Sequence, residues 1–517
     1  MSGFDIRDLL QASAGTLTEG RRASRAAIRP SGSRPAPTAE SAAGVVIGPR
    51  YSPVVVTGIV RLLDASMVLG TGFAVRQLYL ADRIAFDWIH AAVLVGVPVL
   101  LAAVLQAVGA YSVPAFRAFF AVGIKVAAGW TLVFLLALAT VFFAKTGENF
   151  SRVWLAGWYG AGLLALLAER LVLAVVVTRL TRKGRFDRRT AVVGGGPGAE
   201  AMIRALESQP DSGIRIVGLF DDRGDDRSPD VTAGYPKLGG VDELVEYARS
   251  TQLDLVIFTL PISAEARILQ MLSKLWVLPI DIRLSAHSSK LRLRPRAYSY
   301  IGTVPLLDLF DRPIADWDLV LKAVFDRVVG SLLLLLLSPI LLLTALAVKL
   351  DSRGPVFFRQ KRYGFNNELI EVFKFRSMYV DQSDATAAKL VTRDDPRVTR
   401  VGRLIRRTSI DELPQLLNVV FKGDLSLVGP RPHALHAKAE NRLYDQVVDG
   451  YFARHKVKPG ITGWAQINGW RGETDTSEKI QRRVEHDLYY IENWSVFFDL
   501  QILAATPLAL LKSENAY

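Results

Sequence analysis

The 517-residue sequence contains no cysteine. Disulfides, thiol catalysis and cysteine-ligated metal sites are therefore excluded. Histidine is scarce, with six residues, and none belongs to the His-Glu-x-x-His pattern of zinc hydrolases. Acidic residues are fewer than basic ones, 50 against 63, so the formal net charge is +13. Zinc-finger spacings and the aromatic signature of RNA-recognition domains are missing. We therefore expect no nucleic acid as a partner, but an anionic membrane face and anionic substrates.

Hydrophobic runs, in contrast, are abundant. Half of the residues are hydrophobic and the mean hydropathy is +0.23, which is too apolar for an ordinary soluble protein. Residues 1–50 are rich in Ser, Ala, Gly, Pro and Arg, and we expect a disordered basic tail there. In the region 51–180, four apolar segments each come close to the roughly 20 residues that cross a bilayer. They are 54–75, 88–108, 118–143 and 153–177.

Basic residues flank this region on both sides, and the positive-inside rule then places both of its ends in the cytoplasm. They are Arg21, Arg22, Arg25, Arg29, Arg34 and Arg50 before the first segment, and Arg179, Arg182, Lys183, Arg185, Arg188 and Arg189 after the fourth. Within the first segment, Arg61 and Asp64 lie one helical turn apart. We expect them either to pair or to lie at the membrane interface.

Residues 187–305 alternate between strand and helix patterns. A strand from Thr190 runs into a glycine-rich turn, and a second strand, Ile214–Phe220, ends at an aspartate where a ribose would lie. This layout predicts a Rossmann-like βαβ domain. Its candidate nucleotide-binding residues are Gly194, Gly196, Ala199 and Asp221. NAD or another nucleotide is one alternative and no ligand is the other, because a single glycine motif is weak evidence. The Tyr-x-x-x-Lys pair of short-chain dehydrogenases does not occur.

A fifth apolar run, Val328–Val348, has Ser338 and Pro339 at its middle. Proline interrupts the hydrogen bonding of a helix, and basic residues flank the run on both sides. We therefore predict a re-entrant membrane helix, about 319–349, that is broken at Ser338-Pro339 and enters and leaves on one face. A proline-kinked spanning helix is the alternative.

An adjacent carboxylate pair, Asp411 and Glu412, opens a predicted amphipathic helix. The helix is indicated by apolar residues at positions i, i+3, i+4, i+7 and i+8, namely Leu413, Leu416, Leu417, Val420 and Phe421. Pro414 suits a first turn, and Lys422-Gly423 suits an end. Such a pair usually complements the helix dipole, but beside a phosphate it can also take part in phosphoryl chemistry.

Basic residues are interleaved with this region. Residues 353–407 contain 13 Lys and Arg against 6 Asp and Glu. Strand-like alternation predicts that Lys374 and Arg376 share one face. Arg431 lies between two prolines, which leaves little ordering entropy to lose when it binds a phosphate bidentately, although such a segment can also be a plain surface turn. The candidate phosphate-binding residues are Lys374, Arg376, Arg406 and Arg431.

The strings Ser409–Val420 and Ser426–Pro432 closely resemble the bacterial sugar transferase family of polyprenyl-phosphate phosphoglycosyl transferases, and the resemblance covers about residues 319–517. It implies an α-rich catalytic domain, 316–517, that contains the re-entrant helix. It also implies a multi-pass protein of the bacterial inner membrane, in which the N-terminus, the Rossmann-like domain and the catalytic domain are cytoplasmic. The expected fold class is thus membrane α/β.

The resemblance further implies that Asp411 attacks the sugar-bearing phosphate of a UDP-sugar, that UMP leaves, and that undecaprenyl phosphate accepts the sugar phosphate. Glu412 would bind metal or assist proton transfer. Mg²⁺, or alternatively Mn²⁺, would be held by Asp411 and Glu412. The basic residues of the family support Lys374, Arg406 and Arg431. A direct in-line transfer with both carboxylates on the metal remains the alternative.

Later residues have less specific roles. Thr462, Gln466 and Asn468 lie in a turn-rich loop and are either sugar or nucleotide contacts or ordinary turn residues. Asp487 and Asp499 match late acidic positions of the family and would support a metal, orient a basic residue or form simple ion pairs. The C-terminal helix, to about Leu511, is predicted to be interfacial and amphipathic.

The whole arrangement, including Trp470–Ser495, most resembles undecaprenyl-phosphate glucose phosphotransferases that start exopolysaccharide or capsule repeat units. Glucose 1-phosphate is therefore the expected group, with galactose 1-phosphate as the alternative. A catalytically degenerate, membrane-anchored nucleotide-sensing scaffold is an alternative of another class. Homo-oligomerisation stays open.

Overall fold

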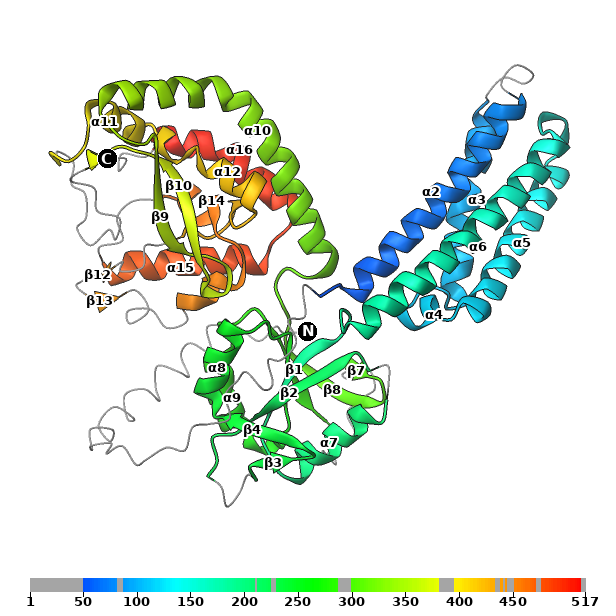
Figure 1. The fold of residues 1–517 in the computed structure, drawn as a ribbon, viewed down its shortest axis with the longest axis horizontal. Coiled ribbons are helices and arrows are strands. Elements are labelled where there is room, and N and C mark those ends of the chain that lie inside the picture. Colours follow the sequence, from blue (N-terminus) through cyan, green and yellow to red (C-terminus); the bar gives the residue numbers. More distant parts are fainter. Residues whose placement is uncertain are drawn as a thin grey trace. The chain divides into compact units, whose positions relative to one another are not determined.

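The computed structural model of the chain describes residues 50–80, 87–209, 212–224, 229–286, 299–380, 395–432, 438–439, 442–443, 451–470 and 476–512. Apart from Arg50, the predicted basic tail lies outside the described residues. The chain forms two compact units, and the boundary between them falls between Arg188 and Arg189 (Figure 1).

The first unit is a bundle of apolar helices (Figure 1). It consists of α2 (Pro53–Leu80), α3 (Trp88–Ala107), α4 (Val113–Arg117), α5 (Phe119–Phe143), η1 (Gly147–Asn149) and α6 (Arg152–Arg182). Four of these helices, α2, α3, α5 and α6, are long and apolar enough to cross a membrane, and each covers one predicted segment to within one residue. Together with the sheet described below, they agree with a membrane α/β protein.

Asp64 of α2 is buried in this bundle and pairs with Arg170 of α6 at 2.5 Å. The Tyr111 hydroxyl donates a second hydrogen bond to the same carboxylate at 2.7 Å. Arg61 instead donates to Gln106 and lies over the Tyr111 ring. The predicted pairing of Arg61 with Asp64 is therefore wrong, because the Arg170 guanidinium of α6 pairs with the Asp64 carboxylate instead.

The second unit begins with a domain built on one mixed sheet, which we call the sheet domain. Its strands follow the order β3-β4-β2-β1-β5-β6-β8-β7. They are β1 (Arg188–Val193), β2 (Ile214–Phe220), β3 (Val231–Thr232), β4 (Tyr235–Gly239), β5 (Leu255–Phe258), β6 (Asp281–Ser285), β7 (Ser299–Ile301) and β8 (Val304–Phe310). Strands β1, β5 and β6 run parallel, whereas β8 and β7 are antiparallel.

Helices cover both faces of this sheet. They are α7 (Pro197–Glu207), α8 (Val241–Ser250), η2 (Ile262–Ala264) and α9 (Glu265–Leu275). Successive strand residues point to opposite faces, so Val192 packs against α7 while Ala191 and Val193 pack against α8 and α9. Doubly covered, largely parallel sheets of this kind bind ligands at the carboxyl ends of their central strands.

Where the structure describes it, the C-terminal domain combines helices with three two-stranded sheets. Its elements are α10 (Asp316–Asp351), β9 (Phe357–Tyr363), η4 (Phe365–Asn367), β10 (Leu369–Phe375), α11 (Arg400–Arg407), η6 (Ile410–Glu412), α12 (Gln415–Leu417), η7 (Asn418–Lys422), β11 (Ser426–Val428), β12 (Lys438–Ala439), β13 (Arg442–Leu443), η8 (Tyr451–Lys456), β14 (Gly460–Thr462), α14 (Trp464–Ile467), α15 (Ser477–Glu492) and α16 (Val496–Lys512). In the described residues, their apolar side chains form a main core that includes Leu416, Leu427 and Tyr490 and two smaller clusters, around Tyr451 and around Val348.

Helix α10 continues through Pro339 without ending, so the predicted break of the helix at Ser338-Pro339 is wrong. Figure 1 shows that the helix bends instead. Proline lacks the N–H that would bond the carbonyl four residues earlier, which belongs to Leu335. The Ser338 hydroxyl donates to that carbonyl at 2.7 Å and replaces the missing bond. The backbone therefore stays helical while its axis turns.

The helical run that begins at Ile410 ends in a π-turn rather than as a regular α-helix. The Gly423 N–H donates to the Asn418 carbonyl at 2.6 Å, five residues back, and Gly423 ends the run at φ 68°. A π-turn holds more residues than an α-turn and rotates the following side chains. Val419 is consequently buried, while Phe421 is 74% exposed. The prediction that Phe421 lies on the buried stripe is wrong.

Candidate active site

A tight turn between α11 and η6 places a basic helix end beside the carboxylate pair. Ser409 adopts left-handed backbone angles, with φ 60°, which cost a non-glycine residue about 1–3 kcal/mol. The turn is closed by hydrogen bonds from the Ser409 N–H to Arg406 and from the Glu412 N–H to Ser409. Arg406 at the end of α11 therefore lies close enough to Asp411 to affect its charge.

Asn418 fixes this helical run to strand β10. It is fully buried, accepts a hydrogen bond from the Phe373 N–H at 3.0 Å and donates to the Glu371 carbonyl at 2.7 Å. One amide side chain thus satisfies both backbone groups that an adjacent strand would have paired. The attachment sets the distance between β10, which carries Lys374, and η6, which carries Glu412.

Glu412 is held between two cations. Lys374 Nζ lies 2.8 Å from its Oε1, and the Arg431 guanidinium meets Oε1 at 2.6 Å and Oε2 at 3.1 Å. The Glu412 side chain is 13% exposed. Burial alone would raise its pKa, but Arg431 and Lys374 together hold the pKa well below the usual range. Glu412 is therefore an ionised anchor that orients both cations.

Asp411 is in the opposite situation. It makes no hydrogen bond or ion pair with the part of the chain that the structure describes, although Lys374, Arg406 and Arg431 lie near it. Burial raises the pKa of Asp411 to about 6, helped by the charge of Glu412, and the three cations only partly offset this. A carboxylate of this pKa is mostly ionised at pH 7, yet more basic than an ordinary aspartate. That combination suits a nucleophile or a base.

At each of its four residues, the backbone of the Gly429-Pro-Arg-Pro432 segment takes part in a hydrogen bond. The Gly429 N–H donates to Thr462, and the Pro430 carbonyl accepts from Gly460 at 3.0 Å. A Cβ at Gly429 would lie 2.6 Å from the Lys458 carbonyl oxygen, so only glycine fits this approach. The Arg431 carbonyl accepts from Arg454 at 2.8 Å and the Pro432 carbonyl from Arg362 at 3.0 Å. Arg431 therefore projects from a fixed support.

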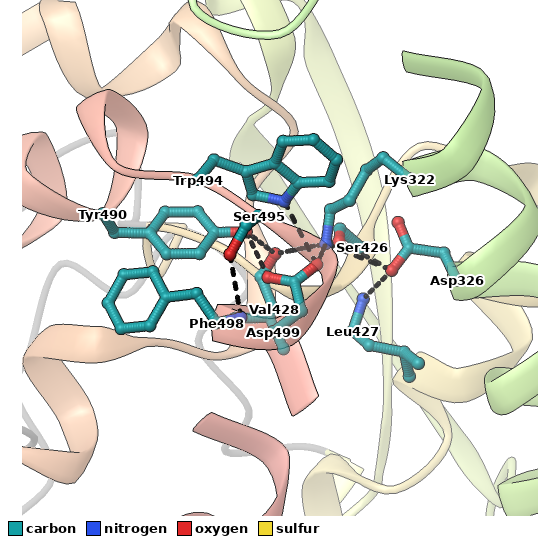
Figure 2. A network of polar contacts seen from close by, with 10 residues as sticks. All are labelled: Lys322, Asp326, Ser426, Leu427, Val428, Tyr490, Trp494, Ser495, Phe498 and Asp499. Atoms are coloured by element: carbon teal, nitrogen blue, oxygen red, sulfur yellow. Dashed lines mark hydrogen bonds and ion pairs between the residues drawn. The ribbon is translucent and has the colours of Figure 1, made fainter. Parts of the chain in front are cut away.

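A buried polar network holds the strand that leads into this segment (Figure 2). Lys322 Nζ lies 2.6 Å from Asp499 Oδ2, 3.3 Å from Asp326 Oδ1 and 3.0 Å from the Val428 carbonyl. The Tyr490 hydroxyl lies 3.0 Å from the same carbonyl and 2.8 Å from Asp499. Asp499 is thus a support for Val428, and its carboxylate does not face Asp411.

Asp487 contacts the site only through Arg454. Its Oδ2 lies 2.5 Å from the buried Arg454, whose guanidinium also holds the Arg431 carbonyl. Of the roles predicted for Asp487, its contacts fit the orientation of a basic residue.

Arg376 and Thr462 have places other than those predicted. Arg376 is 4% exposed, and its guanidinium donates to the carbonyls of Val348, Ser352 and Arg353, where it closes the end of α10. It lies one residue beyond β10, so the strand alternation that would align it with Lys374 no longer applies. Thr462 is buried, and its hydroxyl bonds that of Thr506 on α16. Neither side chain is directed at the carboxylate pair.

The other two loop candidates also differ from each other. Gln466 is 8% exposed and its amide nitrogen has no hydrogen-bond partner among the described residues. Asn468 is exposed and donates to the Trp464 carbonyl at 2.8 Å, where it ends α14. The contacts of Asn468 are those of a turn residue.

Mg²⁺ fits the site only in part. No group of three or more His, Asp or Glu side chains that could hold a metal occurs in the described ranges. Both oxygens of Glu412 are taken by cations, so the predicted pair of metal ligands reduces to Asp411. One carboxylate is sufficient where substrate phosphates and water complete the coordination of Mg²⁺.

A dinucleotide does not fit the glycine turn of the sheet domain as it stands. Asp221, expected at a ribose, accepts the Gly195 N–H at 2.7 Å and is forked by Arg223 at 2.6 to 3.0 Å. Arg223 also donates to the Gly195 carbonyl at 3.0 Å. Burial raises the pKa of Asp221, but these donors outweigh it and lower the pKa to about 2. The carboxylate that was expected to bind a ribose is therefore already paired within the sheet domain.

Several supporting residues escaped the sequence analysis. They are Lys322, Asp326, Asn418, Arg454 and Tyr490. Only Asn418 carried a local signal, as a single polar residue within an apolar helix. The contact of Lys322 with Asp499 spans 177 residues, and no pattern along the chain predicts it.

Two family models match the chain, one over the C-terminal domain and one from the apolar bundle into the sheet domain. Residues 317–513 match the family described as "Bacterial sugar transferase", and residues 106–286 match one described as "CoA-binding domain". The chain is 39% identical over 396 residues to the UDP-glucose:undecaprenyl-phosphate glucose-1-phosphate transferase of Escherichia coli (strain K12), covering 75% of this chain and 81% of that protein.

Two further relatives carry similar names. An undecaprenyl-phosphate glucose phosphotransferase of Komagataeibacter xylinus is 42% identical over 361 residues, covering 70% of this chain and 66% of the relative. A UDP-glucose:undecaprenyl-phosphate glucose-1-phosphate transferase of Xanthomonas campestris pv. campestris is 34% identical over 472 residues, covering 89% and 94%.

Proposed function

The chain belongs to the bacterial sugar transferase family and is a phosphoglycosyl transferase, and from this premise we propose that it transfers glucose 1-phosphate from UDP-glucose to undecaprenyl phosphate. UMP is released and undecaprenyl diphosphate-glucose is formed, as the first membrane step of an exopolysaccharide or capsule repeat unit. The names of the relatives support the donor and the acceptor.

The proposed mechanism rests on one observation: the two adjacent carboxylates have different contacts and therefore different roles. Glu412 neutralises and aims Lys374 and Arg431, whereas Asp411 keeps an unbonded carboxylate of raised pKa. In the first step, an Asp411 oxygen forms a bond to the sugar-bearing phosphorus, and the bond from that phosphorus to the UMP oxygen breaks. The electron pair leaves with UMP, and an aspartyl-phosphosugar remains.

In the second step, an oxygen of undecaprenyl phosphate attacks the same phosphorus and expels the Asp411 carboxylate. No net proton transfer is needed, because attacking and leaving groups are both anions. Lys374, Arg406 and Arg431 stabilise the charge on the phosphoryl oxygens in both steps. Mg²⁺, when bound, would neutralise diphosphate oxygens and so lower their repulsion of Asp411.

We further propose that α10 is re-entrant and that the catalytic and sheet domains lie on the cytoplasmic side of the inner membrane. A straight helix of 36 residues would be about 54 Å long. Both halves of α10 nevertheless contact the same domain: Lys322 bonds Val428, and Asp351 accepts from Val401 at 3.1 Å. The face between them exposes Leu335, Leu336 and Leu343. A helix that returns to one side of the membrane explains both observations.

The function is tested with purified protein in detergent, Mg²⁺, undecaprenyl phosphate and a panel of UDP-glucose, UDP-galactose and UDP-N-acetylglucosamine. We expect UMP release that requires the lipid for repeated turnover, is fastest with UDP-glucose and is absent in Asp411→Ala. A preference for UDP-galactose would replace the proposed sugar. No release from any donor would contradict the transferase function itself.

A further inference from the structure

The six-residue segment η8 lies between the site and the sheet domain. In a 3-10 helix, residues three apart share a face, so Tyr451 and Arg454 point to one side. Arg454 is 1% exposed, lies over the Tyr451 ring and holds the Arg431 carbonyl. One face of η8 therefore supports the arginine that meets Glu412.

The other faces of η8 contact the sheet domain. The Arg249 guanidinium, in the last turn of α8, lies 4.8 Å from the centre of the Phe452 ring. Lys456 Nζ lies 5.3 Å from the Trp276 ring and 5.9 Å from the Phe310 ring. Cation–aromatic contacts of this kind stabilise most where water is excluded. The sheet domain thus holds η8 on both sides of Arg454.

The turn of the β9–β10 hairpin is held from the same place. Asn366 Nδ2 donates to the Ala248 carbonyl at 3.1 Å, next to Arg249 on α8. Asn367 bonds His455 of η8. Asn366 and Asn367 have φ values of 50° and 62°, a left-handed conformation that asparagine adopts more readily than most residues. The hairpin carries Arg362, which holds the Pro432 carbonyl.

The two guanidiniums that hold consecutive carbonyls at Arg431 and Pro432 therefore come from the two segments that α8 contacts. We propose that the sheet domain is a positioning part of the active site: it holds η8 and the hairpin turn, so that Arg454 and Arg362 keep Arg431 aimed at Glu412 and the donor phosphate. This role needs no nucleotide in the sheet domain. It rests on the proposed function for its kinetic consequence, but not for the mechanical link.

The variant Arg249→Ala tests the link from the sheet domain, and Phe452→Leu tests it from η8. The matched control is Lys274→Ala, which removes an exposed ion pair with Asp242 in the sheet domain. For both test variants we expect a roughly tenfold lower kcat for UMP release, a KM for UDP-glucose within about twofold, and an unchanged control. In the Arg454→Lys background the added effect of Arg249→Ala falls below about twofold, because coupled residues are not additive.

Hydrogen exchange of peptides covering 426–432 and 451–457 supplies a readout that does not depend on activity. We expect faster exchange in Arg249→Ala and Phe452→Leu but not in Lys274→Ala. Unchanged exchange at 426–432, or equal effects of Arg249→Ala with and without Arg454→Lys, would overturn the positioning role. Faster exchange in these two variants, together with a wild-type protein that releases no UMP, would instead contradict the proposed function and leave the link intact.

Discussion

Asp221 and Asp411 both occupy places where their sequence patterns predict contact with a nucleotide or a phosphate, yet their surroundings differ. Asp221 has its own arginine, Arg223, and a backbone N–H, and its pKa is lowered to about 2. Near Asp411, two of the three cations, Lys374 and Arg431, pair with Glu412, and the pKa of Asp411 is raised to about 6. A carboxylate with a dedicated donor set is structural, whereas one whose neighbour takes the donors remains reactive.

The largest difference is expected in turnover. Asp411→Asn should lower UMP release by roughly a thousandfold or more, because an amide cannot act as the nucleophile. Asp221→Asn should stay within about threefold of wild type, since its partners lie inside the sheet domain. Steady-state UMP release at pH 7.5 measures both. A comparable loss in the two variants would show that the sheet domain binds a group needed for catalysis.

The next effect concerns Glu412 itself. Glu412→Gln keeps the size of the side chain but removes the charge that pairs with Lys374 and Arg431. We expect kcat/KM to fall by roughly a hundredfold, as is typical when an ion pair that orients active-site cations is lost. The Asp411 carboxylate would still be present, so residual activity should exceed that of Asp411→Asn. The ratio of the two residual rates checks this order, and the reverse order would make Glu412 the nucleophile.

The free energy of unfolding should change in opposite directions in the two variants Asp411→Asn and Asp221→Asn. Asp411 is harder to ionise in the folded state, so it contributes stability below about pH 4 that is lost as the pH rises through about 6. Asp411→Asn should therefore raise the free energy of unfolding by about 1–3 kcal/mol at pH 7.5 and lose this gain near pH 4. Asp221 stabilises above about pH 4 and loses this effect toward pH 2. Asp221→Asn should lower stability by a similar amount at pH 7.5, as thermal unfolding in detergent would measure.

The smallest effect is a shift of the pH profile. If Asp411 must be ionised, kcat/KM should rise with pH through about 6. Because the charge of Glu412 raises this pKa, Glu412→Gln should move the rise to lower pH. Because Lys374 lowers it, Lys374→Ala should move the rise to higher pH, by roughly half a unit to one unit in each case. An acid limb that stays fixed in both variants would remove Asp411 as its origin.

Local patterns predicted the apolar helices and the layered sheet, because each depends on residues close in sequence. Lys374 lies 38 residues from Glu412, and its place beside the carboxylate pair was predicted with the help of the family resemblance. Local patterns failed where a backbone irregularity or a distant partner decides. Because of the π-turn that begins at Asn418, Phe421 lies outside the core. Because β10 ends before Arg376, the Arg376 side chain bonds the end of α10 and does not lie beside Lys374. Asp221 fits a ribose-binding pattern in the sequence, but in the structure it pairs with Arg223, two residues later. Arg454 was beyond prediction because its contacts depend on the folding of three separate segments.

The central claim, that Asp411 carries the sugar phosphate while Glu412 aims the cations, is tested most directly without acceptor lipid. Wild type, Asp411→Asn and Glu412→Gln are mixed with UDP-glucose and Mg²⁺, quenched in acid, and analysed by intact and peptide mass spectrometry. We predict a stoichiometric burst of UMP and one hexose phosphate on the peptide containing Asp411 in wild type, a slower accumulation of the same adduct in Glu412→Gln, and none in Asp411→Asn. No burst and no adduct in an otherwise active wild-type enzyme would contradict the claim.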